Sequence, residues 1–216
     1  MPDLQRISPL LALAPIVVGF LLLLFFLKYL ASPGFKGRLG ERRASRDLAR
    51  QLDPALYRHF HDLYLPRPDG QGTTQIDHVV VSLFGIFVIE TKNFSGWILG
   101  SEKQAQWTQQ IYRKKSRFQN PLHQNKLHVS ALASFLGLAP DLLLPVVVLV
   151  GGCTLKTPMP DNVLTRGLVP WIKGHTAKKL DESARLCAIE ALEALERTTH
   201  RKSAARAHVA ALRARE

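Results

Sequence analysis

The sequence lacks the motifs of several familiar enzyme classes. It contains no Gly-rich phosphate-binding loop, no Cys or His pair with the spacing of a zinc site, and no G-x-S-x-G nucleophile turn, so enzymes built on these motifs are disfavoured. Cysteine is scarce as well. Cys153 and Cys187 are the only two and lie far apart in the chain. Although two cysteines can in principle pair, we interpret both as reduced thiols in a reducing compartment.

Acidic residues are also few. The 216 residues include 17 Asp and Glu against 29 Lys and Arg, which gives a formal net charge of +12. Such an excess of positive charge favours an anionic partner, either nucleic acid or acidic lipid. The chain ends in a basic tail that holds Arg201, Lys202, Arg206, Arg213 and Arg215 against Glu216. The tail can contact anionic lipid or nucleic acid, although most such tails are merely solvated.

One long stretch carries no charge. Residues 9–27 read PLLALAPIVVGFLLLLFFL, and about 20 apolar residues suffice to span a bilayer. We therefore expect a transmembrane helix over residues 9–30. A cleaved secretory signal is the alternative interpretation, but Lys28 follows the apolar run and no A-x-A-like cleavage site is present.

Basic residues are concentrated on one side of this stretch. Arg6 is offset by Asp3 before it, whereas six Lys and Arg lie within residues 28–46 after it. Because positively charged flanks remain on the cytoplasmic side, we expect the rest of the chain to be cytoplasmic. The predicted location is the inner (cytoplasmic) membrane, with a single crossing.

The candidate functional site is a hairpin within residues 75–92, QIDHVVVSLFGIFVIETK, whose apolar strands carry Asp77, Glu90 and Lys92. Charges on strands buried on both faces are costly unless they are paired or bind a metal. If residues 83–84 form the turn, Asp77 faces Glu90 with Cβ atoms roughly 4.5–5.5 Å apart, and Lys92 points the same way. Facing carboxylates repel each other unless a cation lies between them. Mg²⁺ suits such an all-oxygen site.

Two predicted helices flank this hairpin in the sequence. The first, residues 40–52, has Ala44, Leu48 and Leu52 on one stripe. Glu41 lies in its first turn, where a negative charge interacts favourably with the helix dipole. The second covers residues 120–138, with Asn120 as N-cap and Pro121 at the first helical position. Its Gln124 and His128 share a face. They reach a bound phosphate or base if that face looks at the hairpin; otherwise they are simply exposed.

The remaining segments complete an α/β pattern. Residues 56–65 form a first strand or an irregular lead-in, and residues 142–150 form a central apolar strand that contains Pro145. Residues 181–197 form an amphipathic helix with Asp181 as N-cap.

Between the hairpin and the second helix, residues 102–118 mix aromatic and basic side chains. This combination suits stacking on bases together with phosphate contacts, and a solvated loop or strand with aromatics turned inward is an equal alternative. The candidate nucleic-acid contacts are Trp107, Arg113, Lys114, Lys115 and Arg117.

The order of these motifs resembles the nuclease-related domain called NERD, a family assigned to the PD-(D/E)xK nuclease superfamily. The likeness covers roughly residues 37–152 and rests on Gly40-Glu41, QIDHVVVS, GIFVIETKN, GWILG, a Trp, and NPLHQN, in that order. One departure is Ile76, which precedes Asp77 where the superfamily's name has Pro.

The resemblance implies roles for individual residues. It implies that Asp77, Glu90 and the carbonyl oxygen of Thr91 bind Mg²⁺ (or Mn²⁺), with Glu41 adding an acid near the metal. It implies that Lys92 orients or activates the attacking water and stabilises charge on the phosphate. The supporting or substrate-facing positions are Gln75, Gln124 and His128.

The chemistry of the hairpin agrees with this. Hydrolysis of a phosphodiester needs charge compensation in the transition state and a water near the phosphorus, and carboxylate-held metal ions supply both. A lysine is a poor base at its ordinary pKa of about 10.4 but stabilises negative charge.

The resemblance also implies a fold. We expect an α/β, restriction-endonuclease-like mixed β-sheet flanked by helices and preceded by one transmembrane helix. The expected divisions are a short N-terminal segment (1–8), the transmembrane helix (9–30), a linker (31–38), the NERD-like nuclease domain (39–175), and a C-terminal helix with its basic tail (176–216).

Two functions are consistent with these observations. The first is a membrane-anchored, divalent-metal-dependent nuclease that hydrolyses DNA or RNA at the cytoplasmic face. The second is a non-catalytic nucleic-acid-binding or docking module that retains the nuclease fold. A third and weaker hypothesis is a membrane-surface scaffold that binds only acidic lipid.

Overall fold

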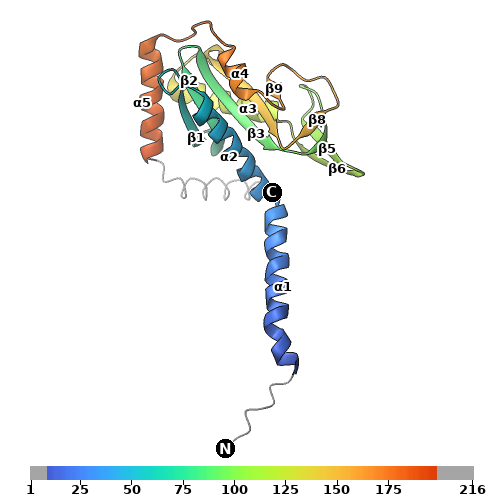
Figure 1. Cartoon of the computed structure of the whole chain (residues 1–216). Coiled ribbons are helices and arrows are strands. Elements are labelled where there is room, and N and C mark those ends of the chain that lie inside the picture. The colour runs from blue at the N-terminus through green and yellow to red at the C-terminus, as the bar shows by residue number, and fades with distance from the viewer. Residues whose placement is uncertain (1–8, 199–216) are drawn as a thin grey trace, which may run out of the picture. The chain divides into compact units, whose positions relative to one another are not determined.

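A computed structural model describes residues 9–198 of the chain (Figure 1). The expected N-terminal segment 1–8 and the basic tail beyond residue 198 lie outside this range. The chain divides into two compact units, residues 1–39 and residues 40–216.

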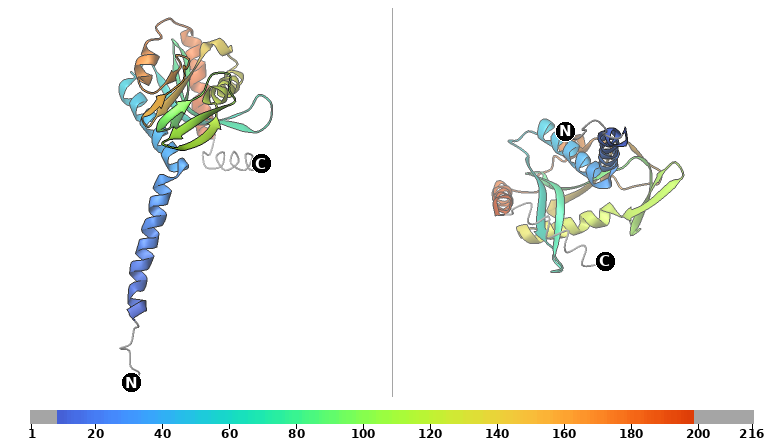
Figure 2. Two further views of the ribbon diagram at one scale, coloured as in Figure 1. Left: turned by 90° about the vertical axis from the view of Figure 1, so that its right-hand side faces the viewer. Right: turned by 90° about the horizontal axis from the view of Figure 1, so that it is seen from below.

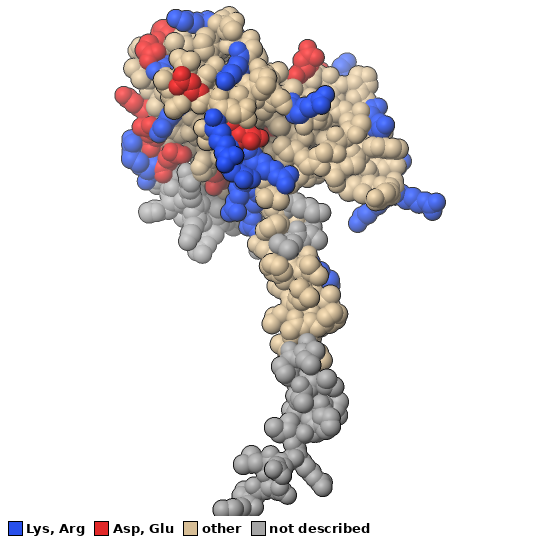
Figure 3. Space-filling model, viewed as in Figure 1, with Lys and Arg blue, Asp and Glu red and all other residues tan. Residues whose placement is uncertain are grey.

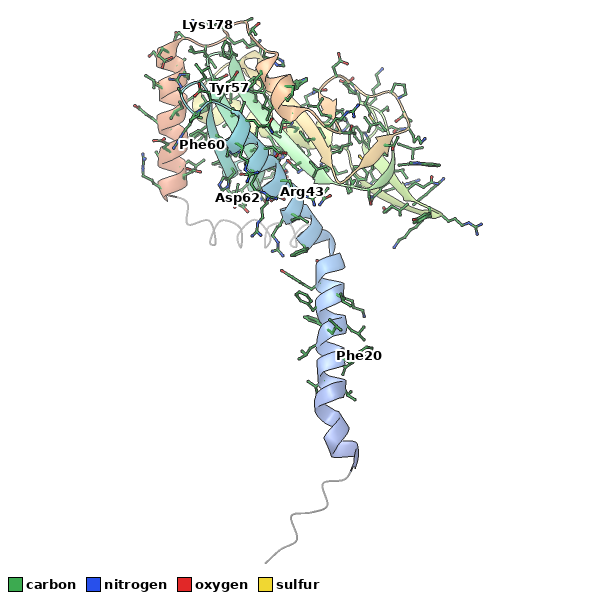
Figure 4. All side chains as sticks on the ribbon, viewed as in Figure 1. Phe20, Arg43, Tyr57, Phe60, Asp62 and Lys178 are labelled. Atoms are coloured by element: carbon green, nitrogen blue, oxygen red, sulfur yellow. The ribbon has the colours of Figure 1, made fainter. Side chains whose placement is uncertain are left out.

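The first unit contains α1 (Pro9–Ala31) and the start of α2 (Pro33–Gln51). The large apolar side chains between Val17 and Tyr29 are exposed; that of Phe20, labelled in Figure 4, is 59% accessible. Within the described part of the chain, no helix meets the length and apolarity needed to cross a membrane. The transmembrane helix expected over residues 9–30 is therefore not supported by the structure.

The linker expected over residues 31–38 is mostly helical instead, because α2 already begins at Pro33. A proline is well suited to the first turn of a helix, where its missing N–H leaves no hydrogen bond unmade. Ser32 alone separates α1 from α2. Its hydroxyl accepts a hydrogen bond from the backbone N–H of Phe35 at 3.3 Å, which satisfies one of the free donors at the start of α2.

The second unit is built on a five-stranded mixed sheet in the order β1-β2-β3-β7-β9. Neighbouring strands are antiparallel from β1 to β3, and β7 and β9 run parallel to β3. The strand bounds are β1 (Arg58–Pro66), β2 (Thr73–Ser82), β3 (Gly85–Asn93), β7 (Leu143–Val150) and β9 (Val163–Leu164). Residues 56–65 thus contain a true strand, and the apolar run at 142–150 is the central strand that its sequence predicts.

Helices cover both faces of this sheet, as Figure 2 shows for α2 and α3. On one face, the predicted stripe of Ala44, Leu48 and Leu52 on α2 is buried, and Leu48 and Leu52 pack on the sheet together with the short helix α4 (Leu168–Lys173). On the other face, α3 (Pro121–Leu136) and α5 (Glu182–Thr198) bury their small and branched side chains. This mixed sheet flanked by helices confirms the expected α/β class.

A second sheet of four strands was not expected. Its order is β6-β5-β4-β8, with β4 (Gly96–Leu99), β5 (Gln106–Ile111), β6 (Lys114–Gln119) and β8 (Cys153–Leu155). Strands β4 and β8 follow directly after β3 and β7 and pair in parallel, so the second sheet starts at the carboxyl ends of those two central strands. Its inner face is buried around Ile98 and Trp107.

Candidate active site

The hairpin β2–β3 has the register that the sequence predicts. Ser82 faces Gly85, and the paired residues continue to His78 and Ile89. Asp77 and Glu90 are the next residue on each strand. At this point a side chain accepts the hydrogen bond in place of a backbone carbonyl: Oδ2 of Asp77 accepts from the backbone N–H of Thr91 at 2.7 Å.

Glu90 is the centre of a buried polar network. Its side chain is only 1% accessible; Oε1 lies 2.6 Å from the Lys92 ammonium, and Oε2 lies 3.0 Å from Nε2 of His128. On the far side of the imidazole, Nδ1 lies 2.8 Å from the hydroxyl of Thr74. Lys92 Nζ also donates to Oε1 of Gln124 at 3.0 Å. The structure therefore brings Glu90, Lys92, Gln124 and His128 together, which spacing alone left open for the last two.

The two carboxyl groups have opposite electrostatic environments. Burial, followed by the nearby charge of Glu90, raises the pKa of Asp77 well above its usual range. Burial also acts to raise the pKa of Glu90, but the hydrogen bond from His128 and the positive charge of Lys92 outweigh burial and lower it. Two neighbouring carboxyls with separated pKa values are a pattern typical of functional sites.

Lys92 keeps its proton in this arrangement. Burial acts to lower the pKa of Lys92, but the adjacent Glu90 carboxylate outweighs burial and raises it. At neutral pH the side chain is therefore an ammonium held between Glu90 and Gln124. It stabilises negative charge and is not a general base in this state.

Helix α3 is fixed against the sheet by two asparagines of the NPLHQN segment. Asn120 caps the helix by accepting from Leu122 N at 2.9 Å, and its Nδ2 is within hydrogen-bond range of three carbonyls of residues 101–104. Asn125 is 1% accessible and donates to the carbonyls of Val88 and Val146, each at 3.0 Å. Because these anchors straddle Gln124, they hold α3 where Gln124 reaches Lys92.

Glu41 reaches the site because a glycine precedes it. A side chain at Gly40 would place its Cβ 2.8 Å from Cβ of Asn93 and 2.9 Å from Cγ2 of Val150. Glycine thus permits α2 to pack against the ends of β3 and β7. The charge of Glu41 is close enough to raise the pKa of Asp77; its role near a metal ion stays a prediction.

Comparison with known protein families shows which family the chain belongs to. Residues 36–150 match the nuclease-related domain, NERD, which is more than half of the chain. The chain belongs to the NERD family. It is also 52% identical over 100 residues to an uncharacterized protein of Bacillus anthracis, and the match covers 46% of each of the two proteins. The chain thus spans less than half the length of that relative. No solved structure matches.

The site explains why the NERD segments occur together. The Gly40-Glu41 pair, the β2–β3 hairpin and the NPLHQN segment are far apart in sequence, and each contributes a side chain around Glu90 and Asp77. These segments therefore form one spatial cluster, at the carboxyl end of β3.

A metal site in this NERD domain is not shown. Among residues 9–198 there is no group of three or more His, Cys, Asp or Glu placed to hold an ion. The donor chemistry nevertheless fits a hard divalent cation, because Asp77, Glu90 and the Thr91 carbonyl offer only oxygen atoms. The repulsion that raises the pKa of Asp77 is the kind that such a cation relieves.

Sequence patterns missed two residues around the site, Asp62 and Tyr64. Asp62 lies on β1 opposite Asp77 with a φ of 58°, an uncommon conformation for a residue other than glycine (Figure 4). It accepts from Nε2 of Gln75 at 2.8 Å, so Gln75 supports Asp62. Burial and the nearby Asp62 raise the pKa of Tyr64 to about 12. An acid within the apolar strand pattern of residues 56–65 was the available signal.

His78, which follows Asp77 in the sequence, belongs to a histidine pair. Nε2 of His59 is 3.3 Å from Nδ1 of His78, across the β1–β2 boundary. Burial lowers the pKa of His59 to about 4 and that of His78 to about 3. Both rings are neutral at physiological pH. They add no positive charge beside the carboxyl groups.

The predicted nucleic-acid contacts divide into two groups. Trp107 is fully buried, and its Nε1 donates to the carbonyl of Ser101 at 2.9 Å. It cannot stack on a base, so its assignment as a contact is wrong; the aromatic side of β5 faces the core. Arg113, Lys114, Lys115 and Arg117 are all exposed around the β5–β6 turn, and their contact with nucleic acid stays a prediction.

Proposed function

We propose that this NERD protein is a divalent-metal-dependent nuclease that hydrolyses phosphodiester bonds of DNA or RNA. The observation that carries the proposal is the arrangement at the carboxyl end of β3. There Glu90 holds a protonated Lys92, and Asp77 lies on the facing strand with a raised pKa. A structural ion pair alone would not require a second, electrostatically disfavoured carboxyl group beside it.

Each residue has a role in that reaction. Asp77, Glu90 and the Thr91 carbonyl would hold Mg²⁺ or Mn²⁺, which when bound activates water and neutralises phosphate charge. Lys92 donates hydrogen bonds to a phosphate oxygen and stabilises the charge that develops on it. Gln124 and Glu90 orient the Lys92 ammonium, and His128 fixes Glu90 from the buried side.

Glu90 must exchange partners for this to occur. Both of its oxygens already interact with cationic or hydrogen-bonding groups, Lys92 and His128. To hold a metal ion, Glu90 would have to share or release its Lys92 contact. Lys92 is suited to this exchange because its side chain remains 26% accessible, whereas that of His128 is 2% accessible.

The activity is tested with the full chain in mild detergent. Supercoiled plasmid, single-stranded DNA and RNA are incubated with Mg²⁺, with Mn²⁺ and with EDTA. We expect metal-dependent cutting that Asp77→Ala and Lys92→Ala abolish. Lys126→Ala, an exposed lysine on α3, is the matched control and should cut like the parent. Equal cutting by parent, Asp77→Ala and Lys92→Ala would show that the site is elsewhere.

A second candidate is a non-catalytic nucleic-acid-binding module. The closed contacts among Glu90, Lys92 and His128, with no three-ligand group in the described residues, are the observation that favours it. This candidate predicts salt-dependent DNA binding that survives loss of Asp77 and Glu90, with no cleavage in any metal. Metal-dependent cleavage by the parent contradicts it.

We further propose that the protein is held at the cytoplasmic face of the membrane, a proposal that rests on the uncharged run at residues 9–27 and the basic residues after it. The basic tail would add contacts to anionic lipid. Fractionation of cells that express the full chain tests the anchor. We expect it to stay in the membrane pellet after a high-salt or alkaline wash, and its release by either wash would refute membrane insertion.

A further inference from the structure

The outer face of the second sheet has an unusual composition. The register places Thr154, Trp97, Gln110 and Lys115 in one row across β8, β4, β5 and β6. Two residues further along, Leu99, Thr108 and Arg117 form the next row on the same face. Since side chains alternate between faces, the buried Ile98 and Trp107 belong to the opposite face.

Trp97 is the exposed aromatic of this face. Its side chain is 48% accessible, whereas Trp107, on the inner face, is fully buried. The ammonium of Lys156 lies 4.6 Å from the centre of the Trp97 ring. This contact anchors one side of the indole, and a large part of the ring surface remains in solvent. About half of the Trp97 side chain is thus open to contact with a ligand.

Charge on this face has one sign. Strands β4, β5, β6 and β8 carry no Asp or Glu, and the exposed Lys115, Arg117 and Lys156 lie around the polar Thr108 and Gln110. In Figure 3, blue side chains project from the end of the molecule that carries β6. A flat aromatic surface surrounded by cations and uncharged hydrogen-bonding groups matches single-stranded nucleic acid, which offers unpaired bases and phosphates together.

The position of this face suits the proposed active site. Trp97 follows Lys92 by five residues, so their Cα atoms are at most about 18 Å apart, a distance that a short single strand can span. Gly96 keeps the connection short. Its φ is 77°, and a Cβ there would lie 2.4 Å from the carbonyl oxygen of Gln110, so β4 packs on β5 directly after the site.

We propose that the outer face of the second sheet binds single-stranded nucleic acid. In this proposal the Trp97 indole stacks on a base, and Lys115, Arg117 and Lys156 contact phosphates on either side of it. Binding itself does not depend on the proposed nuclease function. Only the idea that the bound strand is presented to the site at Lys92 rests on that function.

The test measures binding in EDTA, so that no cleavage is required. The full chain in detergent is titrated with a fluorescent single-stranded oligonucleotide. We expect Trp97→Ala to weaken binding by roughly 5- to 150-fold, the effect of losing one base–aromatic stack. Trp97→Phe keeps an aromatic surface and should bind within a few-fold of the parent, which separates stacking from a folding defect.

Salt dependence tests the cations. Three phosphate contacts predict a slope of log K against log salt of about −2 for a single strand, and each lost cation reduces its magnitude by about 0.7. Lys115→Ala and Arg117→Ala should each show this change. Lys178→Ala removes the same charge from an exposed site between α4 and α5 (Figure 4), and should leave the binding constant and the slope unchanged.

Two competing ligands complete the experiment, a duplex of the same sequence and vesicles of phosphatidylserine and phosphatidylcholine. Tighter binding to the single strand, lost in Trp97→Ala, supports the proposal. Unchanged binding by Trp97→Ala, or binding only to duplex or to vesicles, overturns it. If the parent never cuts nucleic acid but its binding depends on Trp97, the nuclease function fails while this surface stands. If the parent cuts nucleic acid and Trp97→Ala binds it normally, the nuclease function stands and this binding surface fails.

Discussion

Replacing Asp77 by Asn should have the opposite effect on stability from replacing Glu90 by Gln, although the two carboxyl groups lie on facing strands. Burial and the charge of Glu90 disfavour the ionised form of Asp77. Asn removes that charge and still offers an oxygen to the backbone N–H of Thr91. We expect Asp77→Asn to raise the free energy of unfolding by about 0.5–2 kcal/mol, as substitutions at strained functional sites often do.

Glu90→Gln should destabilise the metal-free protein. The substitution leaves the partly buried Lys92 ammonium and the buried His128 imidazole without a carboxylate. Removal of one partner of a buried ion pair typically costs 3–5 kcal/mol; because the Lys92 side chain is 26% accessible, we expect the lower end, about 3 kcal/mol. Urea unfolding of the full chain in detergent and EDTA, followed by tryptophan fluorescence, measures both changes.

Adding a divalent cation extends this experiment. If Asp77 and Glu90 hold the ion, the parent gains about 2.7 kcal/mol when the free metal is a hundred-fold above its dissociation constant. Both variants should lose most of that gain. Two results would speak against these roles. One is a Glu90→Gln variant as stable as the parent in EDTA. The other is an Asp77→Asn variant destabilised by more than about 1 kcal/mol, since Asp77 would then be an ordinary structural group.

Three further predictions concern Gly40, Asn125 and His59. Gly40→Ala would place a Cβ 2.8 Å from Cβ of Asn93. We expect a loss of about 1–3 kcal/mol of stability and slower cleavage. A thermal melt identical to the parent's would contradict this close approach. Asn125→Ala strips the amide donor from two buried strand carbonyls and should cost about 2 kcal/mol, whereas Gln119→Ala, at an exposed position, should cost less than about 0.5 kcal/mol in the same urea titration. His59 has a pKa of about 4 in the folded protein because burial, then the charge of His61, disfavours protonation. The unfolded chain therefore takes up the proton first, so the free energy of unfolding falls as the pH drops from about 6.5 to 4, and His59→Gln should remove about 3 kcal/mol of that fall. An unchanged pH profile in the variant would show that another group is responsible.

The hairpin could be predicted from sequence because its determinants are local. A two-residue turn and the alternation of side chains fix which residues of β2 and β3 face each other, and the observed register follows that rule. The positions of Gln124 and His128 depend instead on how α3 packs. That packing is set by Asn125, whose two strand carbonyls come from β3 and β7, distant segments of the chain.

The second sheet could not be predicted because its pairings are non-local. Strand β8 has three residues and pairs with β4, more than fifty residues earlier in the chain. Without that pairing, the sequence does not reveal which side of β5 faces the core. The aromatic and basic residues of 102–118 therefore read as one mixed surface, whereas the structure separates Trp107 inside from Lys115 and Arg117 outside.

A nuclease site at the carboxyl end of β3 is best tested by plasmid nicking with the full chain, its Asp77→Ala and Lys92→Ala variants and the Lys126→Ala control. We expect nicking by the parent and the control in Mg²⁺ or Mn²⁺, no nicking in EDTA, and a loss of at least about a hundred-fold in rate for both site variants. Metal-independent nicking, or nicking that both site variants retain at the parent's rate, would contradict a nuclease site at the carboxyl end of β3.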